Sequence, residues 1–247
     1  RRKAYVPLET SRRAVLASVA AAVKAGALDN TARHIAITGI SGRGKSAFLA
    51  DLEVQLSSQG WAFSHYTGAD GNRSLENWLA RLLDALMQTG KLITDLPGKT
   101  DERWQALYVA LQETQAGLNQ PIYLLVDAVN QCIEADAASR LSELKLPENV
   151  VLITTTTQDA DAQHWVVHQL PALSTDHRQL AVRSFLSGYR KELASDLVSS
   201  IAADQATSEP LFLRLLLEEL RLHARHETLV QLTAELLETG DAKTLFA

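Results

Sequence analysis

The chain has 247 residues, of which 46% are hydrophobic and 21% are charged, and its formal net charge is −5. This is the composition of an ordinary globular chain, long enough for one large domain or two small ones. The acidic balance argues against direct nucleic-acid binding over a broad surface, and no apolar run approaches the roughly 18–20 residues that a membrane span requires.

Cys132 is the only cysteine, so no intramolecular disulfide can form and a reducing cytoplasm is the expected setting. It follows an apolar stretch and has no local signature of a nucleophile, so we interpret it as buried filler. The chain begins at Arg1 and its single methionine is Met87. We therefore expect a piece of a larger multidomain protein.

Residues 1–33 are predicted to form a lead-in and an alanine-rich helix from Arg12 to about Ala27. The apolar, β-branched stretch 34–38 then predicts a buried strand. Residues 39–46 read Gly-Ile-Ser-Gly-Arg-Gly-Lys-Ser, which fits the phosphate-binding loop G-x-x-x-x-G-K-[ST]. Leucines recur after it as on an amphipathic helix. Strand, glycine-rich loop and helix are the context that the motif requires, which disfavours a chance match.

The residue types of this loop suit a phosphate. Glycines open backbone conformations that other residues avoid, so successive N–H groups can point at one anion at the start of a helix. Lys45 would reach the β- and γ-phosphates, and the hydroxyl of Ser46 would bind Mg²⁺. The predicted nucleotide ligands in this segment are Gly39, Ser41, Gly42, Arg43, Gly44, Lys45, Ser46 and Ala47.

Further along, strand-like and helix-like segments alternate. The expected strands are 61–66, 121–127, 149–155 and a weak one at 166–170, and the expected helices follow Ser74 and cover 101–115. This order predicts an α/β fold with a parallel sheet between helices on both faces, a three-layer P-loop NTPase core over 34–172. After Pro171 only helical patterns follow, so 173–247 should form a small helical subdomain.

Asp127 closes the third expected strand. A carboxylate at the carboxyl end of a parallel strand lies where α/β sheets bind ligands. In nucleotide-hydrolysing loop proteins such an aspartate holds Mg²⁺. A capping aspartate in a strand–helix turn is the alternative, but the loop at 39–46 favours the metal-binding role.

The second motif, Asp127-Ala-Val-Asn-Gln131 after a hydrophobic strand, resembles that of STAND-class P-loop NTPases, relatives of AAA+ proteins, and specifically their NACHT-like branch. The similarity extends over roughly residues 35–240. Its supporting segments are 65–69, 152–155, 169–173, 209–213 and 218–221.

The resemblance implies a switch that binds ATP or ADP with Mg²⁺, passes between closed and open states, and forms a homo-oligomer when open. Pro210 would contact the adenine beneath the helical lid, and Thr155 or Thr156 would sense the γ-phosphate. Effector and sensor domains would lie outside this chain, in a protein of innate immunity, antiviral defence or cell death.

The sequence departs from the pattern of this class in two places. Asn130 and Gln131 stand where further acids are usual, and Ala128 stands where related ATPases keep a catalytic glutamate. An amide can orient a water molecule but cannot accept its proton, so we expect slow hydrolysis with Asn130 in the catalytic set. A base would come from Glu134, Asp136, Asp70 or His65. Proteins of this class often carry an arginine after the fourth strand, and Thr156 and Thr157 stand there in this chain.

Three other functions remain open. A GTPase would require N/T-K-x-D after a late strand, and residues 156–159 are Thr-Thr-Gln-Asp, without the lysine. A small-molecule kinase would need lid arginines, for which Arg178, Arg183 and Arg190 are available. A structural scaffold that binds nucleotide without turnover is favoured by the two amides of the second motif.

Overall fold

The computed structural model describes residues 6–24, 30–69, 72–90, 98–157, 163–223 and 228–246. They belong to two compact units, which we describe separately. The sheet unit comprises Leu8–Gly39 and Lys45–Leu170, and the helical unit comprises Arg1–Pro7, Ile40–Gly44 and Pro171–Ala247. None of the described helices is both long enough and apolar enough to cross a lipid bilayer.

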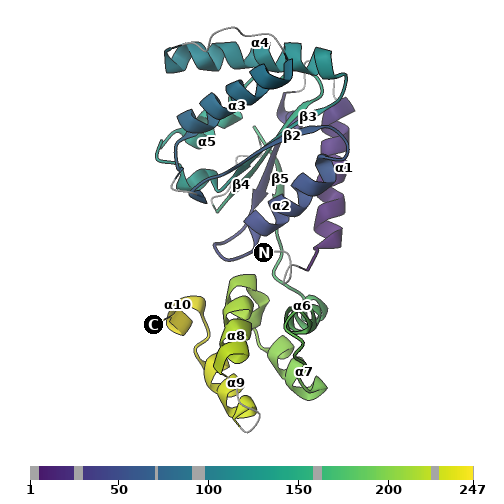
Figure 1. The fold of residues 1–247 in the computed structure, drawn as a ribbon, viewed down its shortest axis with the longest axis vertical. Coiled ribbons are helices and arrows are strands. Elements are labelled where there is room, and N and C mark those ends of the chain that lie inside the picture. The colour runs from purple at the N-terminus through teal and green to yellow at the C-terminus, as the bar shows by residue number, and fades with distance from the viewer. Residues whose placement is uncertain are drawn as a thin grey trace. The chain divides into compact units, whose positions relative to one another are not determined.

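The sheet unit is built on five strands in the order β2-β3-β4-β1-β5, with every neighbouring pair parallel (Figure 1). They are β1 (His34–Thr38), β2 (Trp61–Tyr66), β3 (Ile122–Asp127), β4 (Val150–Thr156) and β5 (Val166–Gln169). The central strands β1, β3 and β4 are almost continuously apolar because both of their faces are buried. The predicted parallel α/β sheet is thus confirmed, and the weak fifth strand pairs with β1 at the edge.

Helices cover both faces of this sheet. They are α1 (Glu9–Lys24), α2 (Lys45–Leu56), α3 (Leu75–Gly90), α4 (Thr100–Leu118) and the short α5 (Ala137–Ser142). Successive side chains of a strand point to opposite faces. In β3, Leu124 and Val126 pack in the core with α3, α4 and α5. The alternate Leu125 is also buried, and it belongs to the face that α2 contacts.

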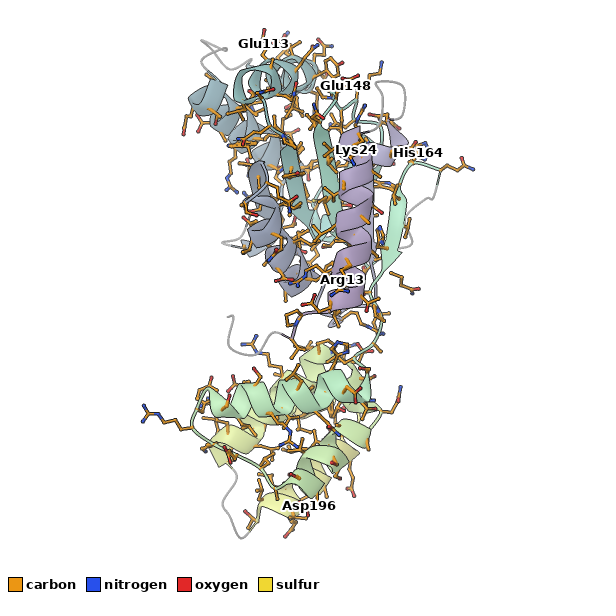
Figure 2. All side chains as sticks on the ribbon, turned by 90° about the vertical axis from the view of Figure 1, so that its right-hand side faces the viewer. Arg13, Lys24, Glu113, Glu148, His164 and Asp196 are labelled. Carbon is orange, nitrogen blue, oxygen red and sulfur yellow. The ribbon has the colours of Figure 1, made fainter. Side chains whose placement is uncertain are left out.

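Exposed charged side chains such as Arg13, Glu113 and Glu148 point outward from the sheet unit (Figure 2). The described elements also include three single-turn 3₁₀ helices: η2 (Thr31–Arg33), η4 (Val129–Gln131) and η5 (Ala206–Ser208). Of these, η4 directly follows β3 and is part of the candidate site described below.

The helical unit contains α6 (Thr175–Ser187), α7 (Ser195–Ala203), α8 (Pro210–His223), α9 (Leu229–Glu238) and α10 (Ala242–Phe246). The hydroxyl of Ser174 accepts the backbone N–H of His177, as expected for the cap of α6. The sequence did not predict α5, α7 or α10, which are five to nine residues long. Elements this short show fewer than three turns of hydrophobic periodicity.

Two longer helices differ from their expected bounds. The first begins at Glu9 instead of Arg12, and residues 25–27 of its expected end lie outside the described residues. The helix expected to end at 115 continues to Leu118, where Asn119 takes a left-handed conformation with φ 50°. Asparagine tolerates this conformation, which ends a helix without requiring glycine. Residues 91–97, between α3 and α4, lie outside the described residues.

Candidate functional site

The glycine-rich loop joins β1 to α2, which begins at Lys45. Gly42 and Gly44 have φ values of 85° and 86°, in the region that side chains disfavour. Lys45 is buried, and its Nζ donates to the carbonyl oxygen of Gly39 at 2.6 Å, so the ammonium lies against the loop. An ammonium and the N-terminus of a 12-residue helix meet here, and both attract anions.

The remaining predicted ligands of this segment differ in exposure. Ser46 and Ala47, in the first turn of α2, are exposed, and so is Ser41 at the tip of the loop. An exposed hydroxyl at Ser46 is accessible to an incoming cation. Ile40 is also exposed, at 54%, which is unusual for an isoleucine of a folded domain.

The central residues of the loop belong to the helical unit, where they contact the start of α8. The backbone N–H of Leu211 donates to the carbonyl oxygen of Gly42 at 3.2 Å. A methyl group added at Gly44 would lie 3.7 Å from Pro210 Cγ. Arg43 Nη2 lies 2.9 Å from Glu209 Oε1, and both side chains are partly buried. Pro210, predicted to contact adenine, thus lies next to the loop within this unit.

Asp127 ends β3, and Thr155 lies beside it on β4. Both are buried, with 5% and 0% exposure. The Thr155 hydroxyl donates to Asp127 Oδ1 and accepts the backbone N–H of Ala128 at 2.7 Å. Ala128 has φ 50°, a left-handed conformation that costs a residue with a side chain about 1–2 kcal/mol. The hydrogen bond to Thr155 helps to hold this strained turn.

The strand order explains why these groups come together. β4 lies between β3 and β1, so Thr155 stands between the end of β3 and the strand that leads into the loop. Its register partner on β1 is Ile37, two residues before Gly39. Strand neighbours are about 4.8 Å apart, so the three strand ends form one short edge. This edge is the carboxyl end of the sheet, where parallel α/β folds place their ligands.

The turn after Asp127 has a second connection, to Thr157 just past the end of β4. Asn130 Oδ1 accepts the backbone N–H of Thr157 at 3.1 Å. The carbonyl oxygen of Gln131 accepts Arg73 Nε at 2.9 Å. Both residues that replace the expected acids therefore lie in a turn that is held by hydrogen bonds on two sides.

The candidate bases are engaged in other contacts. Glu134 accepts the backbone N–H of Leu75 and the hydroxyl of Ser74 at the start of α3. Burial opposes its charge, but these hydrogen bonds together lower the pKa of Glu134. Asp136 is exposed and pairs with Arg140 at 2.7 Å, which lowers the pKa of Asp136. A lowered pKa makes each carboxylate a weaker base.

His65 belongs to the opposite face of the sheet from Asp127. Its register partner is Val126, which packs against α3, and its Nδ1 lies 3.2 Å from Arg81 Nη1 of that helix. Burial first, and then the charge of Arg81, lower the pKa of His65. Asp70 lies outside the described residues.

The residues invoked for other functions are placed as follows. Arg178 is buried and donates to the carbonyl oxygen of Asp204 at 2.6 Å, whereas Arg183 and Arg190 are exposed. The last two residues of the 156–159 segment lie outside the described part of the chain. Cys132 was expected to be buried but is only partly buried, where it packs against the core of the sheet unit; burial still raises the pKa of its thiol, which disfavours a nucleophile.

The donor set suits a magnesium nucleotide better than a free metal. Within the described residues no cluster of three or more His, Cys, Asp or Glu is arranged to hold a metal ion. Mg²⁺ typically takes one or two protein oxygens and completes its shell with phosphates and water. Asp127 and Ser46 would be such ligands, and Lys45 would stabilise the phosphates.

Two features of this site were not evident from the sequence. The family resemblance suggested Thr155 or Thr156 as a contact of the γ-phosphate, and neither as a partner of Asp127. It gave no sign that Arg43 and Glu209 form an ion pair. The only signal for this ion pair was that two segments predicted to contact the nucleotide carry opposite charges, and such charge pairs are common by chance.

No model of a known protein family matches the chain. Telomerase protein component 1 of Mus musculus is 27% identical over 215 residues, a match that covers 77% of this chain and 8% of that protein. The chain therefore spans less than a tenth of the length of this curated relative.

Several solved structures are similar. A Walker-type ATPase of Pyrococcus abyssi has a TM-score of 0.61 at 12% identity, covering 97% of this chain and 74% of that chain. A STAND protein with a tetratricopeptide repeat sensor from Pyrococcus horikoshii has a TM-score of 0.59 at 13% identity, and the match covers 96% of this chain and 33% of that chain. Domain III of the Thermotoga maritima replication initiation protein DnaA has a TM-score of 0.53 at 16% identity, and the match covers 95% of each chain. At these identities the similarity shows the fold alone, and the predicted P-loop NTPase fold is confirmed.

Proposed function

We propose that this chain is an ATPase module of the AAA+/STAND type that binds ATP with Mg²⁺. The observation on which this depends is the edge formed by three adjacent strands. It brings together the end of β1, Thr155 on β4 and Asp127 on β3 within the sheet unit. The similarity to AAA+ and STAND folds supports the same assignment.

The chain's own residues have distinct roles in this proposal. The loop amides and Lys45 bind the β- and γ-phosphates, and Ser46 and Asp127 hold the cation. When bound, Mg²⁺ neutralises the phosphate charge that develops during hydrolysis. Pro210 contacts the adenine, which agrees with its place beside the loop in the helical unit.

Slow hydrolysis follows from the groups beside Asp127. Asn130 cannot accept a proton, and its amide oxygen already accepts the N–H of Thr157. The carboxylates of Glu134 and Asp136 are engaged in hydrogen bonds or ion pairs of their own. Because the described residues beside Asp127 offer no uncommitted base, the module serves as a timer of the bound state.

A switch requires that the nucleotide bind one state of the protein better than another. The contacts of Gly42 with Leu211 and of Arg43 with Glu209 support this role, because phosphates bound by the loop would act on them directly. We propose that ATP and ADP bias these contacts differently, and that the ATP state forms homo-oligomers. As in NACHT-like proteins, the module would lie between the effector and sensor domains of a larger defence protein, and its switch would couple the two.

Equilibrium binding of a fluorescent ATP analogue tests the site. The Lys45→Ala variant should lose at least tenfold in affinity, because it lacks the charge that faces the phosphates. Lys145→Ala is the matched control, because Lys145 is exposed and lies away from the loop in the sequence. Equal affinity of the wild type and Lys45→Ala would overturn the assignment.

The Asp127→Ala variant tests binding of the cation separately from binding of the phosphates. ATP binding in EDTA should stay within about twofold of the wild type, whereas the gain in affinity on adding Mg²⁺ should disappear. An equal loss with and without Mg²⁺ would contradict the role of Asp127 as a metal ligand.

The remaining functions are distinguished with the same protein. Preference for GTP over ATP in competition would favour a GTPase, and phosphate transfer to a metabolite would favour a kinase. If the wild type released phosphate no faster in the steady state than Lys45→Ala, the result would favour a scaffold that binds nucleotide without turnover.

A further inference from the structure

The hydroxyl of Thr155 has a single proton, and that proton is already donated in a hydrogen bond. It donates that proton to Asp127 Oδ1, and its oxygen accepts the backbone N–H of Ala128 at 2.7 Å. The side chain is fully buried, so no water competes for these bonds. To donate to a γ-phosphate, Thr155 would have to release Asp127.

Asp127 is correspondingly constrained. Its Oδ1 is held by Thr155, and among the described residues no partner is found for Oδ2. A carboxylate whose first oxygen is held in place presents the second in one direction. Metal-binding side chains commonly depend on such outer contacts for their orientation.

The turn that follows Asp127 is connected at two points, one on β4 and one at the residue after it. Ala128 donates to Thr155, and Asn130 accepts from Thr157. These two bonds join Thr155 of β4, and Thr157 just after the end of β4, to the turn that contains η4. The position of Asp127 is therefore set by β4 as well as by its own strand.

From these contacts we infer that Thr155 is a positioning residue for Asp127, which holds Oδ1 so that Oδ2 faces the cation of the magnesium nucleotide. This differs from the γ-phosphate contact expected from the sequence. The inference rests on the proposed function, because it concerns the same site.

The strand offers a matched control. Thr154 is the preceding residue of β4, is also buried, and has Val126 of the α3-facing core as its register partner. Thr154 and Thr155 point to opposite faces of the sheet. Thr155→Val and Thr154→Val are the same isosteric exchange on the two faces, and Thr155→Ser retains the hydroxyl.

The test measures the Mg²⁺ dependence of equilibrium binding of a fluorescent ATP analogue to the complete chain. For Thr155→Val, we expect unchanged affinity in EDTA and an increase of about tenfold or more in the Mg²⁺ concentration needed for half-maximal enhancement. Thr155→Ser should restore wild-type behaviour to within about threefold, and Thr154→Val should resemble the wild type.

Three outcomes would overturn the inference. An equal loss of affinity with and without Mg²⁺ would indicate a direct phosphate contact. An unchanged Mg²⁺ dependence of Thr155→Val would show that its hydroxyl does not orient the ligand. Failure of Thr155→Ser to restore the Mg²⁺ dependence, in a folded protein, would assign the effect to packing.

A double-mutant cycle adds a second measurement that remains informative if one variant is poorly stable. In an Asp127→Asn background, Thr155→Val should change the Mg²⁺ dependence no further, because the positioned carboxylate is already absent. An additional loss of similar size would show that Thr155 acts independently of Asp127. If the wild type itself bound no nucleotide, the proposed function would fail, and that result differs from a change confined to Thr155 variants.

Discussion

Arg43, in the glycine-rich loop, forms an ion pair with Glu209, the residue before α8, at 2.9 Å. Arg43 Nε and Glu209 Oε2 are buried and have no other partner among the described residues. The loop thus presents a guanidinium whose charge is already neutralised by the protein. A change at Glu209 should therefore alter how strongly the loop attracts an anion.

Glu209→Gln should increase ATP affinity by about two- to fivefold. The neutral amide no longer offsets the charge of Arg43, and one added charge near a phosphate is worth about 0.5–1 kcal/mol in a partly exposed site. Binding should also become more sensitive to salt. Glu218→Gln is the control, since Glu218 pairs with Arg221 at 2.7 Å at a similar exposure. Weaker ATP binding in Glu209→Gln would contradict this electrostatic role.

Gly42→Ala should destabilise the chain by about 1–2 kcal/mol and weaken ATP binding. Gly42 has φ 85°, and an added methyl would lie 3.2 Å from Leu211 Cβ. Gly117→Ala is the control, because Gly117 lies in α4 with open space around it. Alanine there should leave stability unchanged or raise it by up to about 1 kcal/mol. Urea unfolding compares the two variants, and equal stability would refute the strain at Gly42.

His65 should titrate below its ordinary pKa of about 6.5. Burial and the charge of Arg81 lower the pKa of His65, so the folded protein takes up this proton at lower pH than the unfolded chain. The resulting stability is present above the unfolded pKa and is lost as pH falls below about 6.5 toward the folded pKa. NMR titration of the imidazole, assigned with His65→Gln, measures it. A pKa at or above the ordinary value would show that the ring is more accessible to water than the structure indicates.

Glu134→Gln distinguishes a helix cap from a catalytic base. The carboxylate accepts backbone N–H groups at the start of α3, so the variant should lose about 0.5–1 kcal/mol of stability. Phosphate release per folded molecule should stay within about twofold of the wild type. Asp136→Asn, at an exposed ion pair two residues away, should change neither quantity. A tenfold loss of turnover in Glu134→Gln would restore it as a candidate base.

Much of the sheet could be predicted from the sequence. Each central strand is a mostly apolar run bounded by loop residues; the phosphate-binding loop follows one such run, and Asp127 ends another. Because parallel strands have their carboxyl ends at one edge, the two motifs were expected on the same side of the sheet. The helix α7 was missed although Leu197, Val198 and Ile201 share one of its faces, because nine residues give too few turns for a clear pattern.

The partners of individual side chains required the tertiary structure. Thr155 and Asp127 are 28 residues apart and meet only because β4 pairs with β3 in a particular register. A shift of one residue would turn Thr155 to the other face of the sheet. Likewise, nothing local to Arg43 or Glu209 indicates their contact.

The amino-acid sequence alone determined which groups can bind a phosphate and a cation, and that they follow buried strands, because local residue types and hydrophobic periodicity decide these properties. The tertiary structure alone decided which oxygen of Asp127 is held, that His65 belongs to the opposite face, and that Glu134 caps a helix. These depend on strand order and register, which result from packing between segments far apart in the chain.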